Sequence, residues 1–242
     1  MDIEERQKWR KKIECEIASA ARSGRLLYYT DLLPDDVNEK KRRMFYFILD
    51  EINEKQGETL LPSALVVGEE IGMPGEGFFR KNKKHLGLLG NPSQNRFAAF
   101  AREARKLCAH YGAKKNCGIL IDADQVGTAT TKELLSGIDE KPVVCRAYGN
   151  AETWGIKNNF RDKRNITFFH TPKEEHAIRS ATDFRLYAQA VRIVREIHNK
   201  KLIDKLYIVS CDKGFKHLTD TVKQDGIEVV WLDNEGNKHA LG

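Results

Sequence analysis

The sequence predicts an α/β protein in which a parallel sheet flanked by helices follows a small, mainly helical module. From Cys117 onward, apolar segments of strand length alternate with segments of helical periodicity, which is typical of a parallel sheet with helical crossovers. Before Cys117, apolar residues recur mainly at spacings of three and four, which is typical of amphipathic helices. With 242 residues, of which 40% are hydrophobic, the chain can bury one or two cores.

The first module is expected to span residues 1–92. Residues 4–22 place apolar side chains on one helical face, and residues 37–53 do the same after a proline that favours a helix start. The segment Leu60–Val67 (LLPSALVV) is interpreted as a buried strand, and a glycine-rich loop follows it at residues 72–77. Helices followed by a short strand and such a loop predict a small winged-helix-like domain that binds a protein partner or a nucleic acid.

A basic helix over residues 93–115 is expected to connect the two parts of the chain. The formal net charge is only +6, but between Gly77 and Lys115 ten Lys and Arg residues face a single acid, Glu103. Clustered positive charge attracts polyanions because each neutralised phosphate releases counterions. This stretch therefore favours nucleic-acid binding, and a solvated surface that only keeps the protein soluble is the alternative.

The second part, residues 116–242, is expected to hold the sheet. Short apolar runs bounded by polar turns mark its strands, and apolar residues at spacings of three and four mark its helices. The predicted strands are 118–123, 143–148, 166–170, 206–211 and 227–232, and the predicted helices are 131–138, 181–198 and 215–224.

Composition excludes several classes of protein. No apolar run approaches the roughly 20 residues that cross a bilayer, and 31% of the residues are charged, so a membrane protein is not expected. The start MDIEERQKWRKK lacks the apolar core of a secretory signal, so we expect a cytoplasmic protein. The five cysteines form no Cys-x-x-Cys pair, which argues against a disulfide framework and a four-thiolate zinc site.

Acidic side chains follow two of the predicted strands. Asp122 comes directly after Gly118–Ile121, Asp212 comes shortly after Leu206–Val209, and a third acid, Asp183, opens the long predicted helix. Ligands of parallel sheets bind beyond the carboxyl ends of the strands, so these acids are the first candidates for chemistry. A cluster of carboxylates is costly unless a divalent cation binds there, and hard oxygen ligands suit Mg²⁺ or Mn²⁺.

Each acid also has a purely structural explanation. Asp122 could accept main-chain hydrogen bonds in a turn, and Asp183 or Asp212 could cap a helix. Capping, however, does not require the three acids to share one crevice. Their joint occurrence at two strand ends and a helix start therefore favours a metal site with Asp122, Asp183 and Asp212 as ligands.

Three segments of the second part resemble one known family. The motifs ILIDADQ, RSATDFRLYAQAV and YIVSCDKGFKHL, the last followed by DGIEVV, look like those of the NYN domain, a PIN-like branch of metal-dependent nucleases. The resemblance covers residues 116–234. It implies a PIN-like fold and matches Asp122, Asp183 and Asp212 to the acids of the family, with Ser210 in the late motif.

The sequence departs from the family pattern at three positions. Gln125 stands where asparagine is usual, Gly214 replaces a second acid of the late motif, and Gln189 occupies a position that often holds another helix acid. Gln125 can still form the same hydrogen bonds, and Asp124 can supply negative charge. A non-catalytic regulator that binds RNA or DNA through a degenerate site is the alternative.

The resemblance implies a metal-dependent endoribonuclease that hydrolyses RNA, with single-stranded regions favoured. One or two Mg²⁺ or Mn²⁺ ions held by the three acids would lower the pKa of a bound water and stabilise charge on the attacked phosphate. Asp124, Gln125 and Ser210 would orient a carboxylate or a water molecule. A phosphatase or nucleotidase acting on a small phosphate ester is a third interpretation of the same acids, but it would not need the basic stretch.

Basic and aromatic residues near these motifs are expected to hold the nucleic acid. The segment GNAETWGIKNNFRDKR is polar, so its indole could stack on a base while its cations follow the phosphate backbone. The expected nucleic-acid contacts are Trp154, Lys157, Arg161, Arg179, Lys213 and Lys216.

Overall fold

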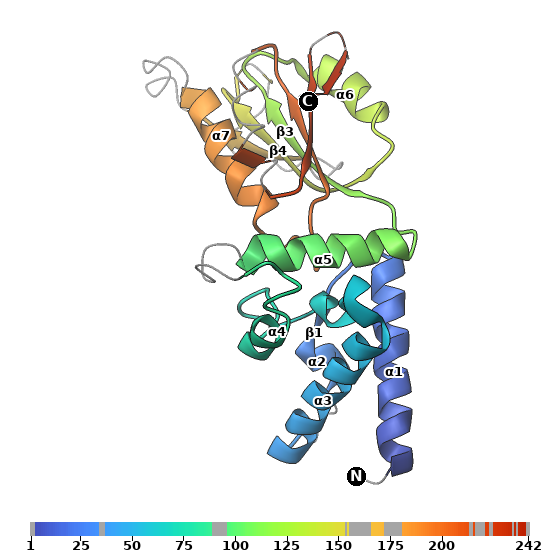
Figure 1. The fold of residues 1–242 in the computed structure, drawn as a ribbon. Helices are drawn as coiled ribbons and strands as arrows, with labels where there is room; N and C mark the ends of the chain where they lie inside the picture. The colour runs from blue at the N-terminus through green and yellow to red at the C-terminus, as the bar shows by residue number, and fades with distance from the viewer. Residues whose placement is uncertain are drawn as a thin grey trace. The chain divides into compact units, whose positions relative to one another are not determined.

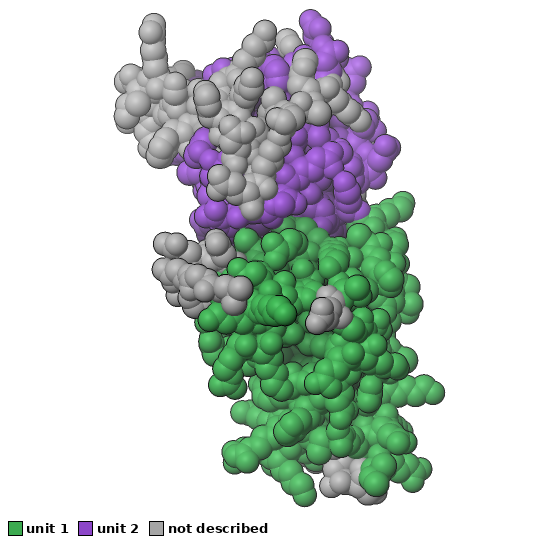
Figure 2. All heavy atoms as spheres, viewed as in Figure 1, with its two compact units in different colours: residues 1–114, 200–202 green, residues 115–199, 203–242 purple. Residues whose placement is uncertain are grey.

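The computed structural model divides the chain into two compact units. Unit 1 consists of Met1–Lys114 and Lys200–Leu202, and unit 2 consists of Lys115–Asn199 and Ile203–Gly242 (Figure 2). None of the helices among the described residues combines the length and the apolarity that a membrane span requires. The described residues are 3–33, 37–88, 96–152, 154, 166–171, 181–212, 215, 221–222, 225–233, 235 and 237–240.

Unit 1 is mainly helical (Figure 1). The helices predicted at residues 4–22 and 37–53 are confirmed as α1 and α3. Ile13 of α1, Phe45 of α3 and Phe100 of α5 are fully buried, so each long helix turns its apolar side to the core of the unit. The helices of unit 1 are α1 (Ile3–Arg22), α2 (Tyr29–Leu32), α3 (Glu39–Lys55), α4 (Glu76–Lys81) and α5 (Arg96–His110).

The strand predicted at Leu60–Val67 is wrong over most of its length. A 3₁₀ turn begins at Pro62 and ends at Leu65, because proline has no N–H to donate to a sheet and its fixed φ suits the first turn of a helix. Only β2 (Val66–Val67) is extended, and it pairs in parallel with β1 (Leu27–Tyr28). The described part of unit 1 therefore contains a parallel pair of very short strands, and the winged-helix-like architecture stays a prediction.

The basic helix predicted at residues 93–115 corresponds to α5, which belongs to unit 1. Its apolar face, which includes Ala99, Phe100 and Leu107, is buried. The helix packs against α1 and against the 3₁₀ turn at Pro62–Leu65. This helix is thus part of the N-terminal core and not an isolated connector.

A short segment from much later in the chain, Lys200–Leu202, also belongs to unit 1. The N–H of Leu26 donates to the carbonyl oxygen of Lys200 at 2.6 Å. The ammonium of Lys200 lies 2.8 Å from a carboxylate oxygen of Asp31 and 4.3 Å from the centre of the Tyr28 ring. These contacts fasten the segment beside β1.

The described residues of unit 2 form a six-stranded sheet in the order β5-β4-β3-β6-β7-β8. Strands β3 to β7 are parallel, and β8 pairs antiparallel with β7. The five predicted strands are confirmed, most of them with slightly shifted ends, whereas β8 is too short to produce a recognisable apolar pattern. The strands are β3 (Asn116–Asp122), β4 (Lys141–Gly149), β5 (Ile166–His170), β6 (Lys205–Val209), β7 (Glu228–Leu232) and β8 (Lys238–Ala240).

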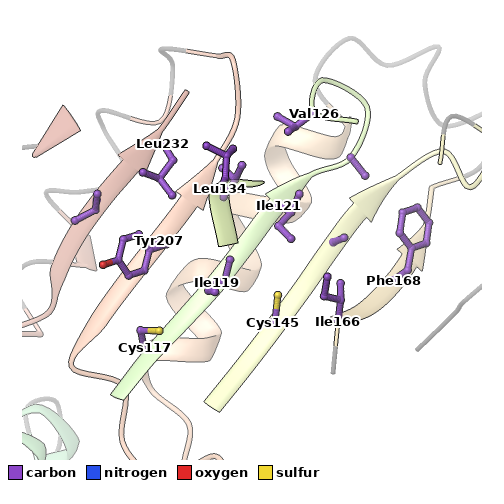
Figure 3. Packing of buried hydrophobic residues seen from close by; sticks show 14 of the residues in the cluster. Cys117, Ile119, Ile121, Val126, Leu134, Cys145, Ile166, Phe168, Tyr207 and Leu232 are labelled. Atoms are coloured by element: carbon purple, nitrogen blue, oxygen red, sulfur yellow. The ribbon is translucent and has the colours of Figure 1, made fainter. Parts of the chain in front are cut away.

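Helices cover both faces of this sheet. Alternate residues of β3 point to opposite faces, so Ile119 and Ile121 join Leu134 of α6 (Thr128–Ser136) in one core. Leu120 joins Leu186 of α7 (Ala181–Val194) in the other core. Figure 3 shows the first of these cores, where side chains from neighbouring strands lie together on one face of the sheet. The central strands of the sheet are therefore buried on both sides.

Two of the three predicted helices of unit 2 are confirmed with different ends. The helix predicted at 131–138 begins at Thr128 and ends at Ser136. The helix predicted at 181–198 ends at Val194, where Nε2 of His198 donates to the carbonyl oxygen of Ile193 at 2.8 Å and satisfies one of the last carbonyl groups of the helix. Most of the helix predicted at 215–224 lies outside the described residues.

Candidate active site

The strand order creates a topological switch point between β3 and β6. From β3 the chain continues through β4 to β5 on one side of the sheet, and then returns to β6 and β7 on the other side. Parallel pairing sets Ile121 of β3 opposite Val209 of β6, so the residues that follow them lie side by side at the carboxyl edge. Ligands of open parallel sheets bind at such a point.

A hydrogen bond joins Asp122 and Ser210 across the switch point. The Oγ of Ser210 donates to Oδ2 of Asp122 at 3.0 Å, and the N–H of Asp212 donates to the same Oγ at 3.1 Å. Asp122 is only 1% exposed and Ser210 is fully buried, whereas Asp212 is half-buried. The structure thus links the carboxylate of Asp122 to Ser210 across the switch point, and the main chain of Asp212 to the same hydroxyl group.

Strand β7 holds Ser210 in place. The N–H of Ser210 donates to the carbonyl oxygen of Leu232 at 3.1 Å, and Nε1 of Trp231 donates to the carbonyl oxygen of Ser210 at 2.6 Å. With its main chain bonded on both sides, Ser210 presents its hydroxyl to Asp122 with little freedom. Trp231 was not among the predicted site residues, although the indole N–H of a buried tryptophan usually has a hydrogen-bond partner.

The second carboxylate oxygen of Asp122 organises the loop after β3. Its Oδ1 accepts a hydrogen bond from the N–H of Asp124 at 3.2 Å, and the carbonyl oxygen of Asp122 accepts one from the N–H of Val126 at 2.9 Å. Asp122 therefore does satisfy main-chain donors in a turn, which is its structural explanation. The bond to Ser210 is an additional contact that the turn does not require.

Asp124 connects this loop to the end of β4. Its Oδ1 accepts a hydrogen bond from the N–H of Asn150 at 2.6 Å. Gly149 permits this close approach, because its φ is +156° and a Cβ atom there would lie 2.8 Å from Oδ1 of Asp124. Asn150, buried directly after β4, is a polar residue of this edge that the sequence analysis missed. The side chain of Gln125 is exposed on the same loop.

Asp183 lies in the first turn of α7, and its side chain is outside the described residues. The topology still locates its main chain, because α7 leads from the end of β5 back to the start of β6 and so begins at the carboxyl edge. In agreement, Nη1 of Arg185 donates to the carbonyl oxygen of His170 at the end of β5, at 3.4 Å. The first turn of α7 therefore lies at the edge that carries Asp122 and Asp212.

Gln189 uses its side-chain amide to bind an arginine of the sheet. Nη1 of Arg146 donates to Oε1 of Gln189 at 2.8 Å, and the guanidinium carbon lies 5.8 Å from the centre of the Phe169 ring. A carboxylate at this position would form an ion pair with Arg146. Gln189 therefore adds no negative charge to the carboxyl edge.

The oxygen atoms gathered at the switch point suit a hard divalent cation. The carboxylate of Asp122 and the hydroxyl of Ser210 are donor types that Mg²⁺ and Mn²⁺ accept, and Asp212 adds a carboxylate to the residues that follow β6. Among the described residues, no group of three or more His, Cys, Asp or Glu side chains is placed to hold a metal ion. The third carboxylate of the predicted set belongs to Asp183.

The predicted nucleic-acid contacts are placed only in part. Trp154 is half-buried, its ring centre lies 5.3 Å from that of Phe168, and its Nε1 donates to the carbonyl oxygen of Val126 at 2.9 Å. These contacts attach the indole to the core that α6 covers. Lys157, Arg161, Arg179, Lys213 and Lys216 lie outside the described residues.

Acidic side chains form ion pairs with many of the cations of the basic stretch. Three of these acids, Asp50, Glu76 and Glu228, lie outside the stretch itself, so its positive charge is smaller than the sequence indicates. Within the described residues, Arg80, Lys83, Lys84 and Lys114 form no ion pair. The ion pairs are Lys81 with Asp50, Arg96 with Glu76, Arg102 and Lys106 with Glu103, and Lys115 with Glu228.

Comparisons with known proteins add a single structural likeness. No family model matches the chain, and no curated protein matches it. A crystal structure of a protein of unknown function from Vibrio parahaemolyticus is similar over 50% of this chain and 82% of its own chain, with 15% sequence identity and a TM-score of 0.36.

Proposed function

We propose that unit 2 is a metal-dependent endoribonuclease with a PIN-like fold of the NYN type. The observation that carries this proposal is the link from Asp122 through Ser210 to Asp212 at the switch point of the sheet. Local turns account for the bond from the N–H of Asp124 to Asp122 and for the bond from the N–H of Asp212 to Ser210. They do not require the buried hydroxyl of Ser210 to donate across the switch point to the carboxylate of Asp122. The strand order also supports the proposal, because parallel sheets of this topology bind ligands at this edge.

The proposed cation is Mg²⁺ or Mn²⁺, held by Asp122 and Asp212 with Asp183 as the third ligand. Such an ion lowers the pKa of a bound water and offsets negative charge on the attacked phosphate. The protein orients the side chains that would bind the cation. Ser210, bonded to β7, keeps Oδ2 of Asp122 aligned, and Asp124 keeps the loop after β3 against the end of β4.

Cleavage of end-labelled single-stranded RNA and of matched DNA tests this function. Wild-type protein should cut RNA in Mn²⁺ or Mg²⁺ and should cut nothing in EDTA. The Asp212→Asn variant keeps the shape of the side chain but loses its charge, so it should lose the activity. Asp139→Asn serves as the matched control, because Asp139 is exposed and precedes β4 at the opposite edge of the sheet. Equal cutting by Asp212→Asn and wild type would overturn the proposal.

A non-catalytic RNA-binding protein is the second candidate, and the contact of Arg146 with Gln189 favours it. This contact places an amide and a cation where the resemblance implies a further acid. Metal binding separates the two candidates. At a concentration of about 100 times its dissociation constant, a bound ion stabilises the folded state by about 2.7 kcal/mol. A rise in melting temperature with Mn²⁺, absent in Asp212→Asn, supports the nuclease, whereas RNA binding without any such rise supports the second candidate.

A further inference from the structure

A pocket of about 350 Å³ lies on unit 1 between α3, α4 and the segment before α4. Aromatic side chains line much of it: Tyr29, Tyr46, Phe47 and Phe78. Phe47 is 60% exposed and Tyr46 is 49% exposed, although both belong to a helix whose other face is buried in the core. Exposed aromatic rings that gather around a hollow are typical of a binding site.

The inner wall of this pocket is fixed by Tyr29. Its hydroxyl accepts a hydrogen bond from the N–H of Gly75 at 2.7 Å, and its ring meets that of Tyr46 edge to face at a centroid distance of 6.0 Å. Burial raises the pKa of Tyr29, so the phenol stays neutral. A rigid, neutral aromatic wall of this kind favours a flat, uncharged group such as a base.

The pocket continues beyond Phe47 into a second hollow. This hollow, of about 340 Å³, is lined by Lys40, Arg43, Met44 and Phe47 on α3. Arg43 and Phe47 line both hollows, so the two hollows are neighbours on α3. A surface with two successive hollows along one helix suits an extended ligand better than a single small molecule.

The charges around the two hollows favour an anionic ligand. Each acid that lines them has a cationic partner: Glu39 pairs with Arg43, Asp50 with Lys81, and Glu76 with Arg96. Two lining cations, Lys40 and Arg80, form no ion pair with a described residue. Because the lining acids are paired with cations, Lys40 and Arg80 are the charged side chains that a phosphate group would contact.

We propose that this aromatic groove on α3 and α4 binds single-stranded RNA. Bases stack on Phe47 and Tyr46, and Arg80 and Lys40 contact the phosphate backbone. Aromatic rings beside cations are the combination that single strands require, because a duplex hides the faces of its bases. The inference rests on the proposed function of unit 2 for its choice of RNA, and unit 1 would then supply the affinity for the strand that unit 2 cuts.

Fluorescence anisotropy with a labelled RNA of about 12 nucleotides, in EDTA so that nothing is cut, tests this groove in the full-length protein. Phe47→Ala should weaken binding at least about fivefold through the loss of stacking. Ile71→Ala is the matched control, because Ile71 is 72% exposed on the same unit and does not line the groove. The melting temperatures of both variants should equal that of the wild type, since both side chains are largely exposed.

The cationic part of the groove has its own test. Arg80→Gln should weaken binding and reduce the slope of log affinity against log salt concentration by about 0.7, which is the contribution of one phosphate contact on a single strand. Lys12→Gln, a change of an exposed cation on α1 outside the groove, should leave both quantities unchanged.

The outcomes separate this inference from the proposed function. If the wild type cuts RNA while Phe47→Ala and Arg80→Gln bind and cut like the wild type, the groove proposal is wrong and the nuclease proposal stands. If the variants lose RNA binding but the wild type cuts nothing, the groove proposal stands and the nuclease proposal is wrong. Equal affinity for duplex RNA, or a dimer of the wild type that Phe47→Ala dissociates, would also overturn the groove proposal.

Discussion

The two edges of the sheet in unit 2 use acidic side chains in different ways. At the amino edge, Glu140 accepts hydrogen bonds from Nζ of Lys205 at 2.9 Å and from the hydroxyl of Tyr207 at 2.6 Å. Glu228 lies 2.8 Å from the ammonium of Lys115 and 3.1 Å from that of Lys205. Glu140 and Glu228 each face a cation, so this network stabilises the fold.

At the carboxyl edge, the hydroxyl of Ser210 donates to the carboxylate of Asp122 and accepts a hydrogen bond from the main-chain N–H of Asp212. A hydroxyl orients a carboxylate without neutralising it. The comparison teaches that the partners and the position of an acid must be considered together. An ion pair such as that of Glu140 with Lys205 indicates a structural role, whereas a carboxylate that a hydroxyl aligns at the switch point is a candidate ligand of a cation.

The largest effect is expected from Asp122→Asn. Asparagine keeps the shape of the side chain and can still accept the hydrogen bond from Asp124, so the melting temperature should change little. Cleavage of RNA should fall by more than about 100-fold, because even the partners of metal ligands are worth about 10- to 100-fold. Initial cleavage rates and circular dichroism check both expectations. Full activity in this variant would show that cleavage does not need the carboxylate of Asp122. The acids of the two edges would then not differ in function.

A smaller effect on metal binding is expected from Ser210→Ala. Loss of the hydroxyl leaves Asp122 without its alignment, so the Mn²⁺ concentration that gives half the maximal cleavage rate should rise by about 10- to 100-fold. Saturating Mn²⁺ should restore most of the rate. Ser136→Ala, which changes an exposed serine at the end of α6, is the control. A merely structural hydroxyl would lower stability and leave the required Mn²⁺ concentration unmoved.

Glu140→Gln should affect stability and not activity. Without the charge of Glu140, Lys205 loses its closest carboxylate, and the partly buried network should lose about 1–2 kcal/mol of unfolding free energy. Urea denaturation measures this loss, with Glu133→Gln on the exposed face of α6 as the control. If Glu140→Gln lowers the cleavage rate as well as the unfolding free energy, the amino edge also contributes to the reaction.

The pH dependence of stability sharpens the comparison further. Burial raises the pKa of Glu140, but hydrogen bonds from Tyr207 and Lys205 outweigh burial, and the pKa lies below its ordinary value of 4.5. A carboxyl group with a lowered pKa stabilises the fold above its unfolded pKa, and this stabilisation is lost as pH falls through the folded value.

The melting temperature of the wild type should therefore exceed that of Glu140→Gln by a constant amount near neutral pH. This difference should shrink once the pH falls below about 4.5. Thermal melts of both proteins across the acidic range measure it. A difference that stays the same at lower pH would mean that the charge of Glu140 does not stabilise the fold.

The smallest effect is expected from Lys115→Ala. The side chain of Lys115 is 59% exposed and that of its partner Glu228 is 44% exposed, so their ion pair is screened by solvent. Unfolding free energy should fall by less than about 1 kcal/mol. A urea denaturation series alongside Glu140→Gln checks the order of the two effects, and a loss as large as that of Glu140→Gln would contradict it.

The strands of unit 2 were predictable because a parallel sheet covered on both faces requires continuous apolar runs. The same rule fails at Leu60–Val67, where an equally apolar run forms a buried 3₁₀ turn at Pro62. Periodicity does not separate a buried strand from another buried segment of the same length. The proline was the local signal that should have decided against a strand.

The candidate site was predictable only to the level of strand ends. Asp122 and Asp212 stand out in the sequence because each follows an apolar strand. That Ser210 donates to Asp122, and that Trp231 holds Ser210, depends on which strands are neighbours in the sheet. Neighbouring strands are distant along the chain, so no local pattern encodes these contacts.

The amino-acid sequence by itself determined the three long helices of unit 1, the parallel strands of unit 2 and the acids worth testing, because these depend on patterns within a few residues. Only the tertiary structure decided which charges are neutralised. It pairs Lys81 with Asp50 and Arg96 with Glu76, and it leaves Phe47 exposed beside a hollow. Ion pairs and pockets depend on distances between segments that packing brings together, and those distances are a property of the fold.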